Sequence, residues 1–410
     1  MYASRENRMT KSSVVPALTL EARLKRRLRE HLTSLGFSKT ARGALIAPGS
    51  DKDVIRALYQ QQRRERLIAS SPFLRTALPY LAGYFANGVE VDPGRIRLRL
   101  HRIRAGTLES ELFRLATLTW SVPVSNGFGR RLRYLVWDDY NNKLVGIIAI
   151  GDPVFNLSVR DDLIGWTSKD RTDRLVNLMD AYVLGAVPPY NMLLGGKAIA
   201  CLVRTRDIFN DFQLKYGAGP GIISGKRKNA SLVAVTTSSS LGRSSVYNRL
   251  TLWGAQYFRP IGYTEGWGHF HIPQELFTDL RKYLRTRRHP YADMNRFGHG
   301  PNWRLRTIRV ALKYLGLEES LLRHGLRRQV FLSQLADNAL QILQTGNGIP
   351  QLNSLKSADQ VSVAVVQRWM IPRAERKPEF RSWDRSELPR LLTSPRTLPY
   401  RPTSLAVESE

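Results

Sequence analysis

One segment of the sequence, residues 281–328, constrains most strongly what this chain can fold into. It contains thirteen Lys or Arg residues and only three acidic residues. Positive charges at this density repel one another, so a compact fold must spread them over exposed surface or neutralise them with a polyanion. Five aromatic residues are interspersed: Tyr283, Tyr291, Phe297, Trp303 and Tyr314. Nucleic acid supplies phosphates for arginine and bases for aromatic rings, so it is the partner that this segment favours.

The composition of the whole chain agrees with that interpretation and excludes several other classes of protein. The net charge is +29, and the 42% hydrophobic residues in a chain of 410 are enough for a core and two or three domains. The single cysteine, Cys201, excludes an internal disulfide and a zinc site of several thiolates. No apolar run approaches the roughly 18 residues of a membrane span. We therefore expect a cytoplasmic protein without a membrane partner.

The chain divides by pattern into five regions. Residues 1–19 are predicted to be a disordered tail. Residues 20–90 form a basic helical region, because leucines recur at helical spacing and a capping sequence begins at Ser50. Residues 91–275 form a central α/β domain, residues 276–371 a second basic helical region, and residues 372–410 an extended Pro-rich tail.

The central domain has a characteristic predicted order of elements. Residues 95–101 alternate Arg with apolar residues, which is typical either of a solvated edge strand or of a phosphate-contacting face. A hairpin follows, then a polar helix, a strand, a helix over 194–216, a strand, a helix over 244–257 and a strand pair through 261–272. This order matches the core of the acyl-CoA N-acyltransferase (GNAT) superfold. The predicted fold class is therefore α/β (α+β), with a GNAT-like mixed sheet flanked by the two basic helical regions.

In that superfold, a helix N-terminus binds the pyrophosphate of the cofactor through free backbone N–H groups. Gly195, Gly196 and Lys197 stand at this position, so they are the candidate cofactor-binding residues. Leu193 occupies the position where the superfold has Arg or Gln, which departs from the acyl-CoA signature. The alternative is that the two glycines only shape a tight turn, so the sequence leaves the cofactor unidentified.

Two pairs of residues are candidates for catalysis. Asp161 and Asp162 could share a proton or hold a magnesium ion, although adjacent acids also cap turns or pair with an arginine such as Arg160. His269 and His271 would share one face of a strand, where they could bind a metal or relay a proton, unless they only form local hydrogen bonds. We expect an aspartate of the first pair to lie near a histidine of the second and to raise its pKa. No spacing in the sequence identifies a metal site.

The candidate nucleic-acid-binding residues are mostly in the basic segment. A helix is predicted after Pro301, in which Arg306, Arg309 and Lys313 share one face and could follow a phosphate backbone. The full set is Arg243, Arg285, Arg287, Arg288, Arg304, Arg306, Arg309 and Lys313.

Five ordered motifs resemble one family, the DruA proteins of the Druantia anti-phage defence system. They are RDDLIGW (160–166), GGK (195–197), GRSSVYN (242–248), GWGHF (266–270) and GPNWR (300–304). The likeness spans roughly residues 20–385. It implies a role in bacterial defence beside other Druantia subunits, including a large helicase-like protein, and it supplies no mechanism.

Three hypotheses about function remain open from the sequence. The first is a nucleic-acid-binding component, of DNA in particular, in an anti-phage complex. The second is an enzyme that modifies or cleaves nucleic acid through the central cleft. The third is a basic scaffold for acidic partner proteins.

Overall fold

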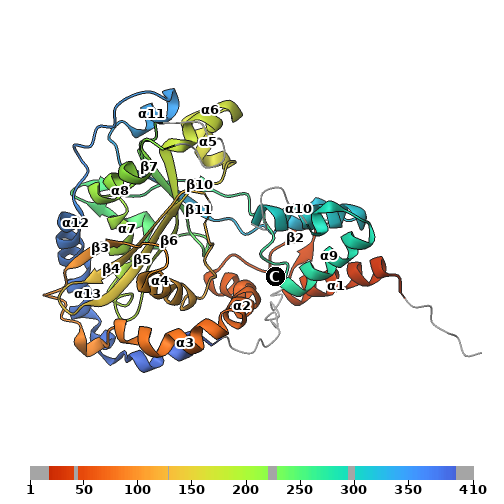
Figure 1. Ribbon diagram of the computed structural model, residues 1–410, viewed down its shortest axis with the longest axis horizontal. Coiled ribbons are helices and arrows are strands. Elements are labelled where there is room, and N and C mark those ends of the chain that lie inside the picture. The colour runs from red at the N-terminus through yellow and green to blue at the C-terminus, as the bar shows by residue number, and fades with distance from the viewer. Residues whose placement is uncertain (1–17, 41–44, 128, 220–228, 294–300, 394–410) are drawn as a thin grey trace, which may run out of the picture.

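The structure is a computed structural model that describes residues 18–40, 45–127, 129–219, 229–293 and 301–393. The chain forms a larger lobe built on a β-sheet and a smaller helical lobe beside it (Figure 1). The predicted tail before residue 18, and Arg296, Phe297 and Gly300 of the motifs above, lie outside the described residues.

A seven-stranded mixed sheet organises the larger lobe. Its strand order is β10-β11-β7-β6-β5-β4-β3, in which β6 and β7 are the parallel pair and every other neighbouring pair is antiparallel. The strands are β3 (Leu98–Arg102), β4 (Arg131–Asp138), β5 (Lys143–Gly151), β6 (Leu178–Ala186), β7 (Ala234–Ser238), β10 (Arg259–Tyr263) and β11 (Gln329–Gln334). The predicted mixed α/β class is therefore confirmed, as are the β4–β5 hairpin and the edge position of β3.

Helices cover both faces of this sheet (Figure 1). Successive residues of β4 alternate between the two faces, so Tyr134 and Val136 contact one layer of helices while Leu135 contacts the other. The first layer contains α7 (Gly195–Leu202), α8 (Arg206–Tyr216) and α12 (Ala358–Val365). The second contains α3 (Ser71–Leu81), α4 (Leu108–Leu118) and α14 (Leu388–Leu391).

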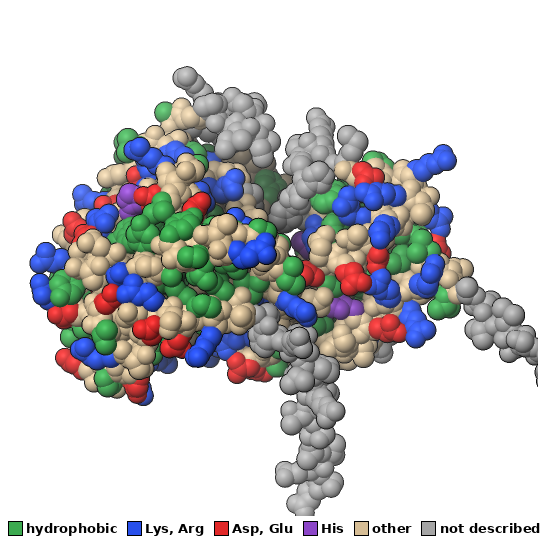
Figure 2. All heavy atoms as spheres, turned by 60° about the horizontal axis from the view of Figure 1, so that its bottom comes forward, with side chains coloured by type: hydrophobic (Ala, Val, Ile, Leu, Met, Phe, Trp, Pro, Cys, Tyr) green, Lys and Arg blue, Asp and Glu red, His purple; other side chains and the backbone are tan. Residues whose placement is uncertain are grey.

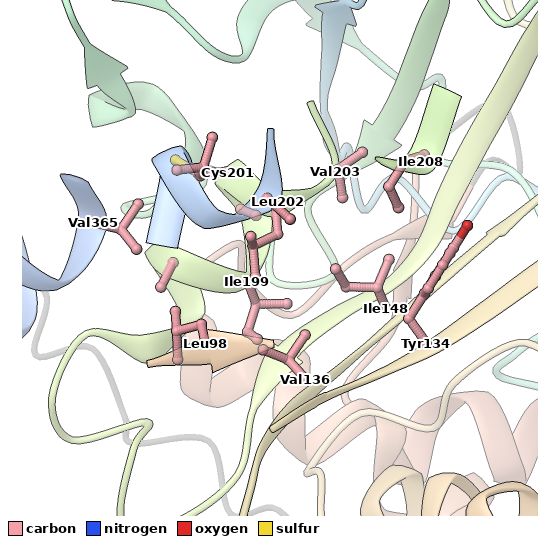
Figure 3. Close-up of a cluster of buried hydrophobic side chains, with 14 of the residues drawn as sticks. Leu98, Tyr134, Val136, Ile148, Ile199, Cys201, Leu202, Val203, Ile208 and Val365 are labelled. Atoms are coloured by element: carbon pink, nitrogen blue, oxygen red, sulfur yellow. The ribbon is translucent and has the colours of Figure 1, made fainter. Parts of the chain in front are cut away.

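Helix α7 is the most deeply buried part of the first layer. Figure 3 shows Ile199 of α7 close to Val136 of β4 and Leu98 of β3, with Val365 of α12 nearby. Cys201 lies in the same cluster and is fully buried. Burial raises the pKa of this thiol well above the usual range.

The smaller lobe combines helices from both ends of the chain. Helix α1 (Leu20–Ser34) packs its buried leucines against α9 (Gln274–Thr286) and α10 (Pro301–Tyr314). The first half of α2 (Lys52–Ala69) and the short strands β1 (Ser38–Lys39) and β2 (Leu45–Ile46) complete it. The helical spacing of the leucines predicted α1 correctly. Parts of the two predicted basic helical regions thus form one lobe, because the apolar faces of α1 and α9 cover each other.

Further elements belong to the sheet lobe. Helices α5 (Ser158–Ile164), α6 (Ser168–Arg174) and α11 (Ala339–Thr345) lie together near the end of the sheet that carries β10 (Figure 1). The strand pair β8 (Thr251–Leu252) and β9 (Ala255–Gln256) and the helix α13 (Ile371–Arg376) complete the elements.

Several predicted elements are wrong. The helix expected over 194–216 is two helices, because Thr205 has extended backbone and starts α8. The helix expected over 244–257 is largely the β8–β9 hairpin, whose turn places Trp253 and Gly254 at positive φ. Residues 265–272 lie outside the strands, so His269 and His271 do not share a strand face.

The predicted regions near the C-terminus also change. Strand β11 joins the central sheet between β10 and β7, so residues 276–371 are not a purely helical region. Apolar residues such as Phe331 and Leu332 are buried there against the sheet core. Residues 372–393 form short helical turns instead of an extended tail, because Phe380 and Leu388 pack into the core.

Candidate nucleic-acid interface

Arg285 of α9 and Arg287, which follows the helix, are already paired with carboxylates. Arg285 donates to Asp293 through Nε, at 2.7 Å, and also through Nη2. Arg287 donates to Glu21 of α1. Each of these pairs is solvent-exposed, so it contributes little to stability, but it neutralises the cation within the lobe.

Arg304, at the start of α10, is half-buried against α9. Its guanidinium donates to the Ile272 carbonyl and to Gln274 Oε1, both at 2.6 Å, and its Cζ lies 4.2 Å from the centroid of the Phe277 ring. Burial lowers the pKa of Arg304 to about 10. This arginine therefore holds α10 against α9, and the contacts leave little of it for a phosphate.

The exposed face of α10 is different. Arg306 and Lys313 are exposed and have no ion-pair or hydrogen-bond partner among the residues that the structure describes. Between them, Arg309 donates to both carboxylate oxygens of Glu319, at 2.8 and 2.9 Å. The opposite face carries Ile308 and Leu312, which are buried. Figure 2 shows Lys and Arg side chains spread over the helical lobe.

Two aromatic residues of the basic segment are unavailable for stacking. Tyr283 and Trp303 are only 1% and 5% exposed, because they pack in the core of the helical lobe. Tyr314 is exposed, while Phe297 lies outside the described part of the chain. The expectation that all five aromatics offer stacking surfaces is therefore wrong for Tyr283 and Trp303.

A two-stranded connection joins the lobes, and we call it the linking ribbon (residues 263–268 and 322–329). The Thr264 N–H donates to the Arg328 carbonyl at 2.9 Å, the Gly325 N–H to the Gly266 carbonyl at 3.0 Å, and the Gly268 N–H to the Leu322 carbonyl at 2.9 Å. An isolated antiparallel bridge pairs Trp267 with Arg323. The ribbon continues the β10–β11 pairing from the sheet to the helical lobe.

The linking ribbon presents an exposed aromatic ring among arginines. Trp267 is 40% exposed, and the Cζ of Arg309 lies 6.0 Å from its ring centroid. Residues paired directly in an antiparallel bridge project to the same face, so Arg323 lies beside the same ring. Arg327 is also exposed on the ribbon, with its Cζ 5.4 Å from the centroid of the Tyr263 ring. The sequence offered the Gly-Trp-Gly spacing as a signal, but Trp267 and Arg323 were not among the predicted site residues.

Arg243 lies where three segments meet at the sheet end of this ribbon. A Cβ on the preceding Gly242 would lie 3.7 Å from the Ser50 carbonyl and 3.9 Å from the Arg327 carbonyl. Arg243 is exposed, and so is Arg288 after α9, where φ is +52°. Neither has an ion-pair partner among the described residues.

The two aspartates of the Asp161–Asp162 pair have different environments. Asp161 is buried and accepts from Arg160 Nε at 2.8 Å and from Arg171 Nη1 at 3.0 Å, while Asp162 is exposed. Arg160 is itself fully buried and also donates to the carbonyls of Val154 and Phe155. The pairing with Arg160 that the sequence left open as an alternative is the one observed.

His269 and His271 belong to a different environment in the helical lobe. The Nε2–H of His271 donates to the Leu321 carbonyl at 3.0 Å, while its buried Nδ1 has no hydrogen-bond partner among the described residues. The His271 ring lies 5.8 Å from that of His324 and 5.7 Å from that of Phe37.

The pKa values of these histidines shift in the direction opposite to the expected one. Burial lowers the pKa of His269 and of His271 to about 4, and that of His324 to about 3. Neighbouring cations such as Arg304 lower the pKa of His269 further. The expectation that an aspartate raises a histidine pKa here is therefore wrong. Among the described residues, no group of three or more His, Cys, Asp or Glu could hold a metal ion.

Close packing explains one of the two glycines in the Gly195–Lys197 turn. A Cβ on Gly195 would lie 2.5 Å from the Tyr190 carbonyl, whereas a Cβ on Gly196 would meet nothing within 4 Å. The Lys197 ammonium lies 5.1 Å from the Trp369 ring, and burial lowers its pKa. Leu193 is fully buried in the sheet core, which explains an apolar residue at this position.

One carboxylate was not among the predicted site residues. Asp180 on β6 accepts from Thr236 Oγ1 at 2.8 Å, and burial raises its pKa to about 6. Asp180 is the last residue of β6 that pairs with β7. Beyond it the two strands have no paired residues, although β6 continues to Ala186.

Comparison with known proteins identifies the family. The family model described as Druantia protein DruA matches residues 49–345. A curated protein named Druantia protein DruA, from Escherichia coli (strain UMEA 4076-1), is 60% identical over 368 residues, which are 90% of this chain and 91% of that protein. The chain belongs to the DruA family. No solved structure matches it.

The DruA match includes the structural features described above. It begins just before α2 and ends with α11, so it contains the whole sheet, the linking ribbon and α10. The resemblance expected from the five motifs is thus confirmed, and DruA is a component of the Druantia defence system. No helix in the described part of this DruA protein is both long and apolar enough to cross a membrane.

Proposed function

We propose that this DruA protein is the nucleic-acid-binding component, with DNA as the partner, of a Druantia anti-phage defence complex. The observation that carries the proposal is the unneutralised charge of three exposed cations: Arg306 and Lys313 on α10 and Arg327 on the linking ribbon. Because these cations have no carboxylate partner among the described residues, phosphates can neutralise them without breaking an internal ion pair.

The sheet lobe, in this proposal, is a GNAT-like platform. The strand order supports it, because a single parallel pair, β6–β7, stands inside an otherwise antiparallel sheet. The separation of β6 from β7 after Asp180 and the start of α7 beyond β6 support it as well. Lys197 packs on Trp369, and Leu193 is buried, so acyl-CoA binding at this turn has no support from their side chains.

The enzymatic alternative has one supporting observation. A half-buried carboxylate with a pKa near 6, such as Asp180, is protonated and deprotonated close to neutral pH, as a general base must be. Asp161, Asp162, His269 and His271 do not support it, since the structure gives the two pairs separate partners. The alternative therefore depends on Asp180 and the diverging strands β6 and β7.

The partners that follow are DNA and the other Druantia subunits, including a helicase-like protein, in the cytoplasm. A basic scaffold for acidic proteins would use the same cations. DNA and acidic proteins differ in the geometry that they require. Arginine guanidinium groups beside an aromatic ring can bind phosphates and stack with bases, whereas an acidic peptide requires only positive charge.

The test is a competition experiment on the full chain. Labelled DNA is titrated with the protein by fluorescence anisotropy, with polyglutamate at equal charge as the competitor. We expect DNA to bind and to resist displacement by polyglutamate, and the recovered DNA to keep its mass. Equal displacement at equal charge would favour the scaffold, and a changed DNA mass would favour the enzyme. Absence of DNA binding would contradict the proposal.

A further inference from the structure

We propose that Trp267 of the linking ribbon stacks on an unpaired base, which makes single-stranded DNA the substrate class of this interface. The inference rests on the proposed DNA binding and adds the form of the DNA. It starts from the ring itself, which is 40% exposed although it lies in an ordered, hydrogen-bonded part of the chain.

The ring is held in place by its backbone. Trp267 lies between the two hydrogen bonds that join Gly266 to Gly325 and Gly268 to Leu322. Gly266 has φ +68°, and a Cβ there would lie 2.8 Å from the carbonyl carbon of Gly325. Only glycine allows the two segments to approach this closely, so the ribbon fixes the backbone under the tryptophan. A pre-positioned aromatic ring loses little conformational entropy when a ligand stacks on it.

The charges around the ring fit a nucleic-acid strand. The Arg309 guanidinium lies over the ring, and Arg323 is paired with Trp267 across the ribbon. Arg306 and Lys313 are exposed on the same helix as Arg309. Acidic residues are also present: Glu319 pairs with Arg309, while Glu265 and Glu318 are exposed nearby in the sequence. Cations close to an exposed indole match a phosphate backbone that passes beside a stacked base.

The form of the DNA follows from what an exposed ring can reach. In a duplex, the faces of the bases are covered by their neighbours, so an aromatic side chain cannot stack on them without unstacking the helix. In a single strand, each base has a free face, and stacking is tolerant of sequence. Trp267 therefore contributes to binding of unpaired DNA and adds little to binding of duplex.

A second exposed tryptophan provides a matched control. Trp253 is 54% exposed at the turn of the β8–β9 hairpin, and no cation lies over its ring among the described contacts. Replacing it removes the same chemical group from the surface of the sheet lobe. Trp267→Phe keeps an aromatic ring at the ribbon and checks that the effect depends on stacking.

The experiment compares two forms of one DNA sequence. A mixed-sequence oligonucleotide is titrated, as a single strand and as a duplex, with the unmutated protein and with Trp267→Ala, Trp267→Phe and Trp253→Ala. We expect Trp267→Ala to weaken single-strand binding by about 5- to 150-fold, the range that loss of one stacked base gives. Duplex affinity should change less than about 2-fold, Trp267→Phe should retain most single-strand affinity, and Trp253→Ala should match the unmutated protein.

Other outcomes overturn the inference in distinguishable ways. If the unmutated protein binds DNA but Trp267→Ala leaves single-strand binding unchanged, or weakens both forms equally, only the stacking role is wrong. If the loss appears with single-stranded RNA and not with DNA, the assigned ligand is wrong. If the unmutated protein binds neither form of DNA, the proposed function itself fails. Thermal unfolding of each variant shows whether it is folded. If Trp267→Ala does not fold, the comparison uses Trp267→Phe, which keeps an aromatic ring at this position.

Discussion

Helices α5 and α10 both carry charged residues that the sequence marks as functional, yet the structure uses them in opposite ways. At α5, Arg160 is fully buried and Asp161 accepts from it and from Arg171. At α10, Arg306 and Lys313 are exposed and have no partner among the described residues. The contrast between α5 and α10 shows that the type and spacing of charged residues do not indicate function until their partners are known.

The contrast has a physical origin. A charge taken out of water is tolerated only when an opposite charge and hydrogen bonds replace its solvation, so the arginine at α5 comes with its own carboxylate. A charge on an open helix face keeps its water and needs no partner. The first kind of arginine stabilises the protein, and the second kind is available to a ligand.

The largest expected effect comes from breaking the buried group at α5. Arg160→Leu leaves Asp161 with Arg171 as its remaining cation and leaves the carbonyls of Val154 and Phe155 without their donor. We expect the free energy of unfolding to fall by about 3–5 kcal/mol. Urea denaturation of the full chain measures it.

The control for this variant is Lys169→Ala on α6, an exposed cation close in sequence. It should change the free energy of unfolding by less than about 0.5 kcal/mol. If the Arg160→Leu variant is as stable as the unmutated protein, then the buried charges of α5 do not stabilise the fold, and the contrast with α10 is wrong.

His271 resembles the charged residues of α5, because it too was predicted to be catalytic and is buried. The unfolded chain takes up protons at its histidines as the pH falls below about 6.5, whereas folded His271 takes one up only near pH 4. The contribution of His271 to stability is therefore complete at neutral pH and declines as the pH falls from about 6.5 towards 4. At about pH 5 the loss is about 2 kcal/mol for His271 alone.

Denaturation at a series of pH values measures this effect. His271→Gln keeps a donor for the Leu321 carbonyl but cannot titrate, so the variant should lose less stability between about pH 8 and pH 5 than the unmutated protein does. An equal loss in both proteins would mean that His271 does not contribute to the pH dependence.

The sequence predicted local structure well where a periodic pattern was long. The leucine spacing of α1, the β4–β5 hairpin and the alternating edge strand β3 all follow from such patterns. It failed where distant segments meet. Nothing local shows that β11 inserts between β10 and β7, or that residues 322–328 pair with 263–268 to make the linking ribbon.

The candidate site divides in the same way. The face shared by Arg306, Arg309 and Lys313 could be predicted from helical geometry alone. The burial of Arg304 could not, because its acceptors, Gln274 and the Ile272 carbonyl, lie 30 and 32 residues earlier. Trp267 could not be predicted for the same reason, because its neighbours Arg309 and Arg323 come from other segments of the chain.

Removal of the two unpartnered charges of α10 is the direct test of DNA binding by this helix. The double variant Arg306→Ala/Lys313→Ala is compared with Arg75→Ala/Arg376→Ala, which removes the same charge from exposed positions on α3 and α13 of the sheet lobe. The measurement is the slope of log affinity against log salt concentration for duplex DNA. Each lost phosphate contact lowers that slope by about 0.9, so the α10 variant should lose close to 2 while the control keeps the slope of the unmutated protein. Equal slopes for all three proteins would contradict the account.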